Sequence, residues 1–324
     1  MKNSSKLLQN AGFTKYPITT NDVFMSDVIV ANWFNNLDIA AALEDYDLLD
    51  KKYFMDLFNP FLELISENVD LQATAYILYQ ILFEQDVFKK VVLRRDEIDM
   101  LPVFVLLSGH KKHIQNMTAR GFDGEQINLH KKSVGDQCLL GIKKYKIKGA
   151  TISRLLWARN YINACVIQIG NLQYKLGKDE PEYRNIGINS NYTVSIHIPY
   201  GGRFDDASVG ESLCKAKVAI KKYFSEVDDD TPFVCDSWLL DEDLGKYLSP
   251  DGNISKFRNR FQFIKSNDDS KILKHVFNNL PKDVDFHLLP EDTSLRREIK
   301  RALIKGVKFY DGIGLLKPDN LTCI

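Results

Sequence analysis

The chain has 324 residues, and its 43 Lys and Arg residues balance its 43 Asp and Glu residues. Proteins whose main partner is nucleic acid carry a basic excess, so this balance argues against such a partner. No apolar run approaches the roughly 20 residues that cross a bilayer, and the first residues lack the apolar segment of a secretory signal. We expect a cytoplasmic, globular protein of one or two domains without a nucleic-acid or membrane partner.

The five cysteines are scattered along the chain, and none forms a C-x-x-C pair. An odd number without a secretory signal predicts reduced thiols, and it makes a zinc site unexpected. His110 and His113 in "GHKKHI", with His130, are the remaining metal candidates. Because no carboxylate or cysteine lies at ligand spacing, we expect these histidines at the surface and no bound metal.

Residues 20 to about 160 read as one helix after another. "TNDVFMSDVIVANWF" places apolar residues at helical spacing, with Thr20 or Asn21 as a plausible cap. "DGEQINLH" begins with Asp123 and has Gln126 three residues later, which resembles a capping box. These patterns predict a helical domain over residues 1–160.

The pattern changes near residue 160, where strand-like segments begin. "CVIQIGNLQYKLG" and "NYTVSIHIP" are β-rich, "DDASVGESLCKAKVAIKKYF" is an amphipathic helix, and "PFVCDSWLL" is a buried-strand candidate. A strand, helix and strand in succession predict parallel strands at 192–198 and 233–240. Helical segments near "SKFRNRF" and "TSLRREIKRALIKG" precede a last strand-like "VKFYDGIGLL". We therefore predict an α+β fold with a mixed sheet over residues 161–324.

"TVSIHIPYGG" ends its strand in an unusual way. Strand alternation places Thr193, Ser195 and His197 on one face, and Pro199 cannot continue the hydrogen-bonded ladder. Gly201 and Gly202 would let the backbone approach a ligand closely. Polar residues at the carboxyl end of a parallel strand are typical of ligand sites in open sheets. The alternative is an ordinary turn beside a structural histidine.

The partner strand "FVCDSWLL" carries Cys235 and Ser237 on one face and Asp236 and Trp238 on the other. We expect Ser237 or Cys235 within reach of His197, an arrangement suited to proton transfer or nucleophilic chemistry. The alternative is that the cysteine and the tryptophan are packing residues.

Two arginines, Arg258 and Arg260, flank aromatic residues in "SKFRNRFQFIK", a stretch with no acidic residue. Guanidinium groups suit phosphate binding, although a solvated surface is an equal alternative.

The strings "IQIGNLQYKLG", "VSIHIPYGG", "FVCDSWLLDEDLGKYLSPDGNISKFRNRF" and "TSLRREIKRALIKG…GIGLL" resemble a bacterial family of two-domain N-acyltransferases. Members of this family have a helical N-terminal domain and a GNAT-like C-terminal domain. The resemblance covers most of residues 160 to 316 and is looser around "MTARGFDGEQI". It implies a splayed mixed sheet in which acyl-CoA enters between two parallel strands and its thioester meets an amine.

One segment departs from the family pattern. GNAT enzymes usually follow the first parallel strand with Arg/Gln-x-x-Gly-x-Gly/Ala, whose amides hold the pyrophosphate. Here Gly201 and Gly202 precede Arg203, and Asp205 and Asp206 begin the helix. Two carboxylates at that helix start would repel a pyrophosphate.

The leading hypothesis is acyl transfer from acyl-CoA to an amine of a small molecule or peptide. His197, with a pKa near 6.5, would be the general base, and Ser237 or Cys235 would protonate the thiolate. The alternative is a non-catalytic module that binds a ligand or a protein partner, which the carboxylates at the helix start favour. A thiol hydrolase that uses Cys235 and His197 is the third hypothesis. The candidate cofactor contacts are Tyr200, Gly201, Gly202, Arg203, Arg258 and Arg260, and the candidate substrate contacts are Trp238 and Asn253.

Overall fold

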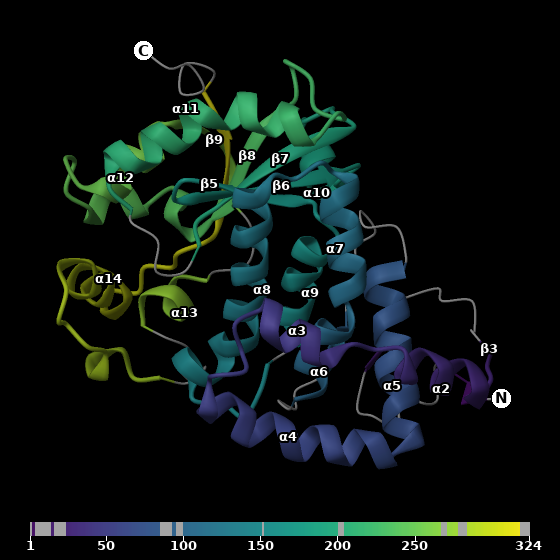
Figure 1. Cartoon of the computed structure of the whole chain (residues 1–324). Coiled ribbons are helices and arrows are strands. Elements are labelled where there is room, and N and C mark those ends of the chain that lie inside the picture. The colour runs from purple at the N-terminus through teal and green to yellow at the C-terminus, as the bar shows by residue number, and fades with distance from the viewer. Residues whose placement is uncertain are drawn as a thin grey trace. The chain divides into compact units, whose positions relative to one another are not determined.

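The computed structural model describes residues 2–3, 14–15, 24–84, 93–94, 100–150, 152–199, 204–266, 271–277 and 284–317. The chain divides into two compact units, residues 1–165 and 166–324 (Figure 1). Among the described helices, none is long and apolar enough to cross a membrane.

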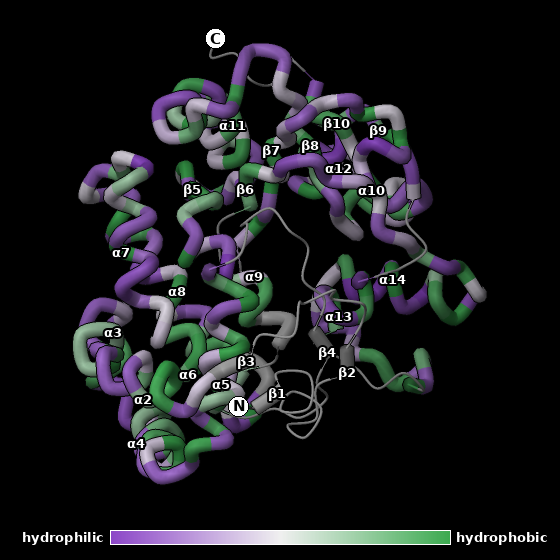
Figure 2. Tube along the Cα trace, turned by 90° about the vertical axis from the view of Figure 1, so that its right-hand side faces the viewer, coloured by the Kyte–Doolittle hydropathy of each residue, from purple (hydrophilic) through white to green (hydrophobic). Residues whose placement is uncertain are grey.

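The first unit is built from helices packed around α6 (Leu101–Ser108), whose residues are all buried. Figure 2 shows α6 in green along its length, whereas α7 is largely purple. A helix that is apolar on every side must be enclosed by its neighbours. The surrounding elements are α2 (Asp27–Asn35), α3 (Ile39–Asp45), α4 (Lys52–Glu67), α5 (Val69–Tyr79), the π-helical turn η1 (Gln80–Glu84), α7 (His110–Ala119), α8 (Gly124–Tyr145) and α9 (Ile152–Ile162).

The start of this unit differs from the sequence-based prediction. Helix α2 begins at Asp27 after the cap Ser26, so the predicted helix starts too early, and Thr20 and Asn21 lie outside the described residues. Short antiparallel strand pairs also occur here, so the unit is not wholly helical. The pairs are β1 (Lys2–Asn3) with β3 (Phe24–Met25), and β2 (Thr14–Lys15) with β4 (Leu93–Arg94). The predicted cap at Asp123 is confirmed, since its carboxylate accepts the Gln126 N–H.

The predicted surface position of the central histidines is wrong. His113 and His130 are fully buried, with His113 Nε2 3.4 Å from His130 Nδ1. The Tyr46 hydroxyl lies 3.0 Å from His113 Nδ1, and burial beside a second imidazole lowers the pKa of His113 well below its usual value. The three side chains therefore form a hydrogen-bonded chain in the core, in which His113 is neutral. No group of three metal-binding side chains gathers among the described residues.

The second unit is a six-stranded open sheet of order β5-β6-β7-β8-β10-β9. Its strands are β5 (Val166–Ile169), β6 (Leu172–Lys178), β7 (Tyr192–His197), β8 (Phe233–Ser237), β9 (Phe261–Ser266) and β10 (Gly312–Leu316). All neighbours are antiparallel except β7 and β8, so the predicted mixed sheet and the predicted parallel pair are confirmed. Strand β8 is shorter than predicted, because residues 238–240 form the 3₁₀ turn η2 (Trp238–Leu240). Edge strand β9 was not predicted.

Helices cover both faces of this sheet. On one face α10 (Pro181–Arg184) places the Tyr183 hydroxyl 3.3 Å from Ser195 Oγ, and Val234 and Ile313 pack in the same cluster. On the other face lies α11 (Asp206–Tyr223), where Ser212 Oγ is 2.9 Å from the Tyr174 hydroxyl (Figure 1). The other elements are η3 (Leu244–Tyr247), α12 (Asn253–Asn259), α13 (Ile272–Val276), η4 (Phe286–Leu288) and α14 (Ser294–Ile304).

One cysteine departs from the prediction of reduced thiols. Cys138, Cys165 and Cys235 are free and buried, whereas Cys214 on α11 is disulfide-bonded.

The turn η2 packs directly on β10 because position 312 is a glycine. A Cβ atom at Gly312 would lie 2.2 Å from the Leu240 carbonyl oxygen, which no real structure accommodates. Gly245 is a contrasting case, since a Cβ there would lie 3.5 Å from the nearest atom, in ordinary contact.

We expect Gly312→Ala to destabilise the second unit by about 1–3 kcal/mol, because the added methyl group must displace backbone. Gly245→Ala is the matched control and should change stability by less than about 0.5 kcal/mol. Urea unfolding followed by tryptophan fluorescence measures both. Equal stabilities of the two variants would contradict the close approach of η2 to β10.

Candidate functional site

The candidate site lies where β7 and β8 separate. Their parallel pairing joins only Val194 to Phe233 and Ser195 to Val234. Strand β7 continues to His197 along β6, while β8 continues to Ser237 along β10. The two strands are thus held by their outer neighbours and are not paired with each other toward their carboxyl ends. Beyond these two pairs the facing edges of β7 and β8 form no ladder with each other, as the resemblance implies.

His197 is the last residue of β7 and borders this gap. Its side chain is half-buried, and its Nε2 atom is withdrawn from solvent. Burial, assisted by the nearby ammonium groups of Lys175 and Lys271, lowers the pKa of His197 to about 3. The expected pKa near 6.5 is therefore wrong. The imidazole is neutral at physiological pH, because the surroundings disfavour its charged form.

The two lysines near His197 are each paired with a carboxylate. Lys175 Nζ lies 2.7 Å from Glu180, which also accepts the Thr193 hydroxyl at 2.7 Å. Lys271 Nζ lies 2.5 Å from the fully buried side chain of Asp311. These pairs fix charges on the strand face that carries His197.

Strand parity corrects the predicted partners of His197. Paired residues in neighbouring strands share a face, so Ser195 lies on the same face as Val234. Alternation then places His197 and Asp236 on this face and Cys235 and Ser237 on the opposite one. Neither predicted partner shares the face of His197, whereas the exposed Asp236 does.

Ser237 and Cys235 also have local roles. Ser237 Oγ accepts the Leu239 N–H at 3.2 Å and so caps η2. Cys235 is buried, and burial raises the pKa of its thiol, which stays protonated. A protonated thiol on the other face cannot serve as a nucleophile activated by His197, so the thiol hydrolase hypothesis loses its support.

The predicted substrate contacts lie in different surroundings. Trp238 is partly buried against the cluster that contains Leu244 and Ile299, with its ring parallel to His275. Asn253 is exposed at the first turn of α12. The structure does not bring these two residues together with His197 in one pocket of the described part.

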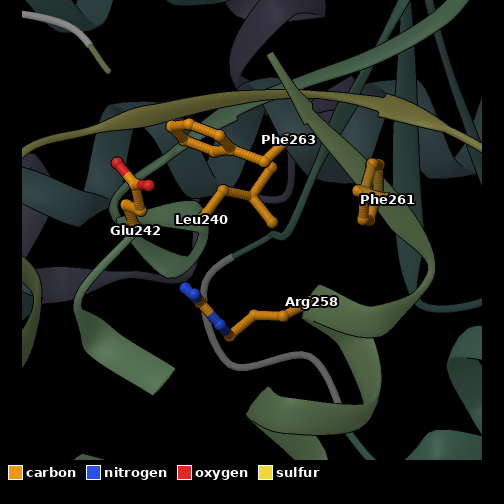
Figure 3. A pocket seen from close by; sticks show the side chains of 5 residues that line it. All are labelled: Leu240, Glu242, Arg258, Phe261 and Phe263. Atoms are coloured by element: carbon orange, nitrogen blue, oxygen red, sulfur yellow. The ribbon is translucent and has the colours of Figure 1, made fainter. Parts of the chain in front are cut away.

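Arg258 lines a pocket with Leu240, Glu242, Phe261 and Phe263 (Figure 3). Its Nη1 donates to the Leu239 carbonyl, and burial lowers its pKa.

Arg260 points elsewhere and pairs with Asp206 at 2.7 Å. Asp205 caps α11 by accepting the Ser208 N–H at 2.9 Å. The two carboxylates at the helix start are therefore engaged within the chain. The Arg260 guanidinium balances the charge of Asp206, which weakens the predicted repulsion of a pyrophosphate. Tyr200, Gly201, Gly202 and Arg203 lie outside the described residues.

Sequence reasoning missed Lys175, Lys271 and Asp236 as neighbours of the gap. Lys175 lies directly opposite Ser195, so a predicted pairing of β6 with β7 would have found it. No sequence pattern around Lys271 indicates that it lies near His197, because only the fold brings the two residues together.

Comparison with protein families finds a match to the GNAT-like C-terminal domain over residues 166–316. The match confirms the resemblance for the second unit. Comparison with curated proteins finds no significant match.

Solved structures similar to the chain are acyltransferases. One, in complex with decanoyl-CoA, has a TM-score of 0.66 at 19% identity and covers 90% of this chain and 99% of that chain. Another, in complex with CoA and 10C-teicoplanin, has a TM-score of 0.65 at 17% identity and covers 97% and 93%. A third, with decanoyl-CoA and teicoplanin, has a TM-score of 0.65 at 20% identity over 78% and 79%. At such identities the similarity establishes the fold.

The low pKa of His197 makes a prediction about acid sensitivity. An unfolded histidine gains a proton below about pH 6.5, whereas folded His197 stays neutral down to about pH 3, so stability is lost as pH falls through this range. We expect His197→Gln to remove about 1–2 kcal/mol of this loss between pH 7 and pH 5. Urea unfolding at both pH values measures it. In NMR spectra the His197 Hε1 shift should stay constant from pH 8 to pH 5, and a midpoint above pH 5 would contradict the assignment.

Proposed function

We propose that the protein is an N-acyltransferase that moves an acyl group from acyl-CoA to an amine of a small molecule or peptide. The observation that carries the proposal is the gap between β7 and β8, whose parallel pairing ends after two residue pairs. Solved acyltransferases of the same fold, bound to decanoyl-CoA, octanoyl-CoA or CoA, support it.

The gap suits the extended pantetheine arm of CoA. The arm contains amide groups that can bond to a strand edge, as an added peptide strand does. In the reaction the amine nitrogen attacks the thioester carbonyl, the C–N bond forms and the C–S bond breaks. The nitrogen loses a proton, and the departing thiolate gains one.

His197 is our candidate for the group that receives the amine proton. Its neutral imidazole is a weak base, so it cannot deprotonate a free ammonium ion efficiently. The nitrogen of the tetrahedral adduct is far more acidic than an ammonium ion, and a weak base beside it suffices. Asp236, on the same strand face, is the candidate that would hold the incoming amine. Ser237 and Cys235 have no role in this scheme.

The proposal predicts that acyl-CoA binds the folded protein. Decanoyl-CoA at about a hundred times its dissociation constant should add roughly 2.7 kcal/mol of stability. Differential scanning fluorimetry with acetyl-, octanoyl- and decanoyl-CoA measures this, and mass spectrometry with a panel of amines detects the acylated product. If no CoA ester at millimolar concentration raises the melting temperature, the proposed function is wrong.

A second prediction distinguishes a catalytic role of His197 from a structural one. We expect His197→Gln to reduce turnover by about 10²-fold, at the low end for a general base because the imidazole is weakly basic. The wild-type pH–rate profile should follow ionisation of the acceptor amine, with no inflection near pH 6.5. His287→Gln, the same change at an exposed histidine of η4, is the control and should leave turnover unchanged. Equal turnover of both variants would remove His197 from the reaction.

A further inference from the structure

A second site of small volume lies on the sheet face opposite His197. It is a pocket of about 200 Å³, lined by Leu240, Glu242, Arg258, Phe261 and Phe263. Pairing of Phe263 with Gly314, and of Gly314 with Cys235, places the Phe263 side chain on the face of Cys235. Pockets for drug-sized ligands usually measure 300–1,000 Å³, so this one admits only a small molecule.

The cationic wall of the pocket is held in place by the backbone. Arg258 is partly buried, and its Nη1 donates to the Leu239 carbonyl. A Cβ atom at Gly245 would lie 3.5 Å from Nη2, so this segment lies against the guanidinium on a further side. Within the described part of the chain, no carboxylate forms an ion pair with Arg258. The buried Asp241 carboxylate lies near enough to favour the charge of Arg258, but its oxygens accept the Leu244 and Tyr310 N–H groups. A partly desolvated guanidinium with no carboxylate in direct contact favours a bound anion.

Glu242 supplies the opposite charge. It is exposed, and its carboxylate makes no hydrogen bond or ion pair with any residue that the structure describes. Figure 3 shows the Glu242 carboxylate and the Arg258 guanidinium toward one end of the pocket and the Phe261 ring toward the other. The pocket therefore contains separate positive and negative groups that do not neutralise each other.

The remaining walls are apolar. Leu240 and Phe261 are buried, whereas Phe263 is 40% exposed on the edge strand β9. Leu240 and Phe261 approach closely over Gly314, where a Cβ atom would lie 2.8 Å from Leu240 Cδ1 and 3.0 Å from Phe261 Cβ. A ligand that covers the exposed Phe263 side chain removes apolar surface from water, which favours binding.

We propose that this pocket binds a free hydrophobic α-amino acid. Its carboxylate pairs with Arg258, its ammonium with Glu242, and its side chain packs on Phe261 and Phe263. A zwitterion satisfies both unmatched charges at once, which a simple anion or amine does not. The pocket lies on the sheet face opposite His197, so an ammonium group held there is away from the proposed base. The site thus recognises this amine without acylating it, and it is independent of the proposed transfer reaction.

The test uses the full chain without CoA and three probes in isothermal titration calorimetry. L-phenylalanine carries both charges, 3-phenylpropionate only the carboxylate, and 2-phenylethylamine only the ammonium. We expect L-phenylalanine to bind about tenfold more tightly than either analogue, since each lost charged contact costs roughly that factor. Glycine, which lacks the apolar group, should not bind measurably. Absence of L-phenylalanine binding at millimolar concentration overturns the proposal.

Variants assign the contacts. Glu242→Gln should weaken L-phenylalanine about tenfold and leave 3-phenylpropionate unchanged, because only the ammonium contact is lost. Arg258→Lys, which keeps the charge but loses the planar donor pair, should weaken both ligands. Glu211→Gln, the same change at an exposed glutamate of α11, is the control and should alter neither. If Glu242→Gln leaves L-phenylalanine binding intact in a folded protein, the amino acid binds elsewhere and the proposal is wrong.

Discussion

The short parallel contact between β7 and β8 is the constraint on which the second unit depends. Strand β7 is held by six residue pairs with β6, and β8 is held by four pairs with β10. Each strand is therefore paired along most or all of one edge with an antiparallel neighbour. Only two pairs join the two halves of the sheet, so β7 and β8 are unpaired beyond them while the pairing within each half is kept. A gap with fixed walls is the feature that an extended ligand requires.

Charges around the gap are neutralised by residues of the same chain. Lys175 pairs with Glu180, Lys271 with the buried Asp311, and Asp206 with Arg260. The Asp311 side chain is fully buried, so the loss of Lys271 would leave a buried carboxylate without its cation. His197 stays neutral mainly because it is buried, and Lys175 and Lys271 lower its pKa further. The charges around the site therefore occur as ion pairs and not as an excess of one sign.

These contacts bear on the choice between an enzyme and a binding module. The two carboxylates at the start of α11 favoured the module, because free carboxylates repel phosphate groups. Asp205 is used as a cap and Asp206 is paired, so that argument is weaker in the folded protein. A neutral imidazole next to the gap suits an uncharged thioester and an amine that loses its proton late. The geometry agrees better with acyl transfer.

The sequence by itself determined the helical and the α+β units, the parallel β7–β8 pair and the position of His197 at the end of a strand. These features follow from hydrophobic periodicity and from the termination signal of Pro199, which are local properties. It also determined that Cys235 and Ser237 share a face, since strand alternation is fixed by the backbone. Strand β9 escaped notice because its six residues directly follow a short helix.

Tertiary structure alone decided which groups meet across elements. The register of β7 against β8 set His197 on the face of Asp236 instead of that of Cys235. The pKa of His197 depends on burial and on Lys271, which is 74 residues away along the chain. The buried residues His113 and His130 were predicted to lie at the surface. The spacing of residues along a helix does not show which other elements pack against that helix. Strand register, burial and long-range charge pairing depend on contacts between residues that are far apart in the sequence. No local pattern in the sequence can therefore specify them.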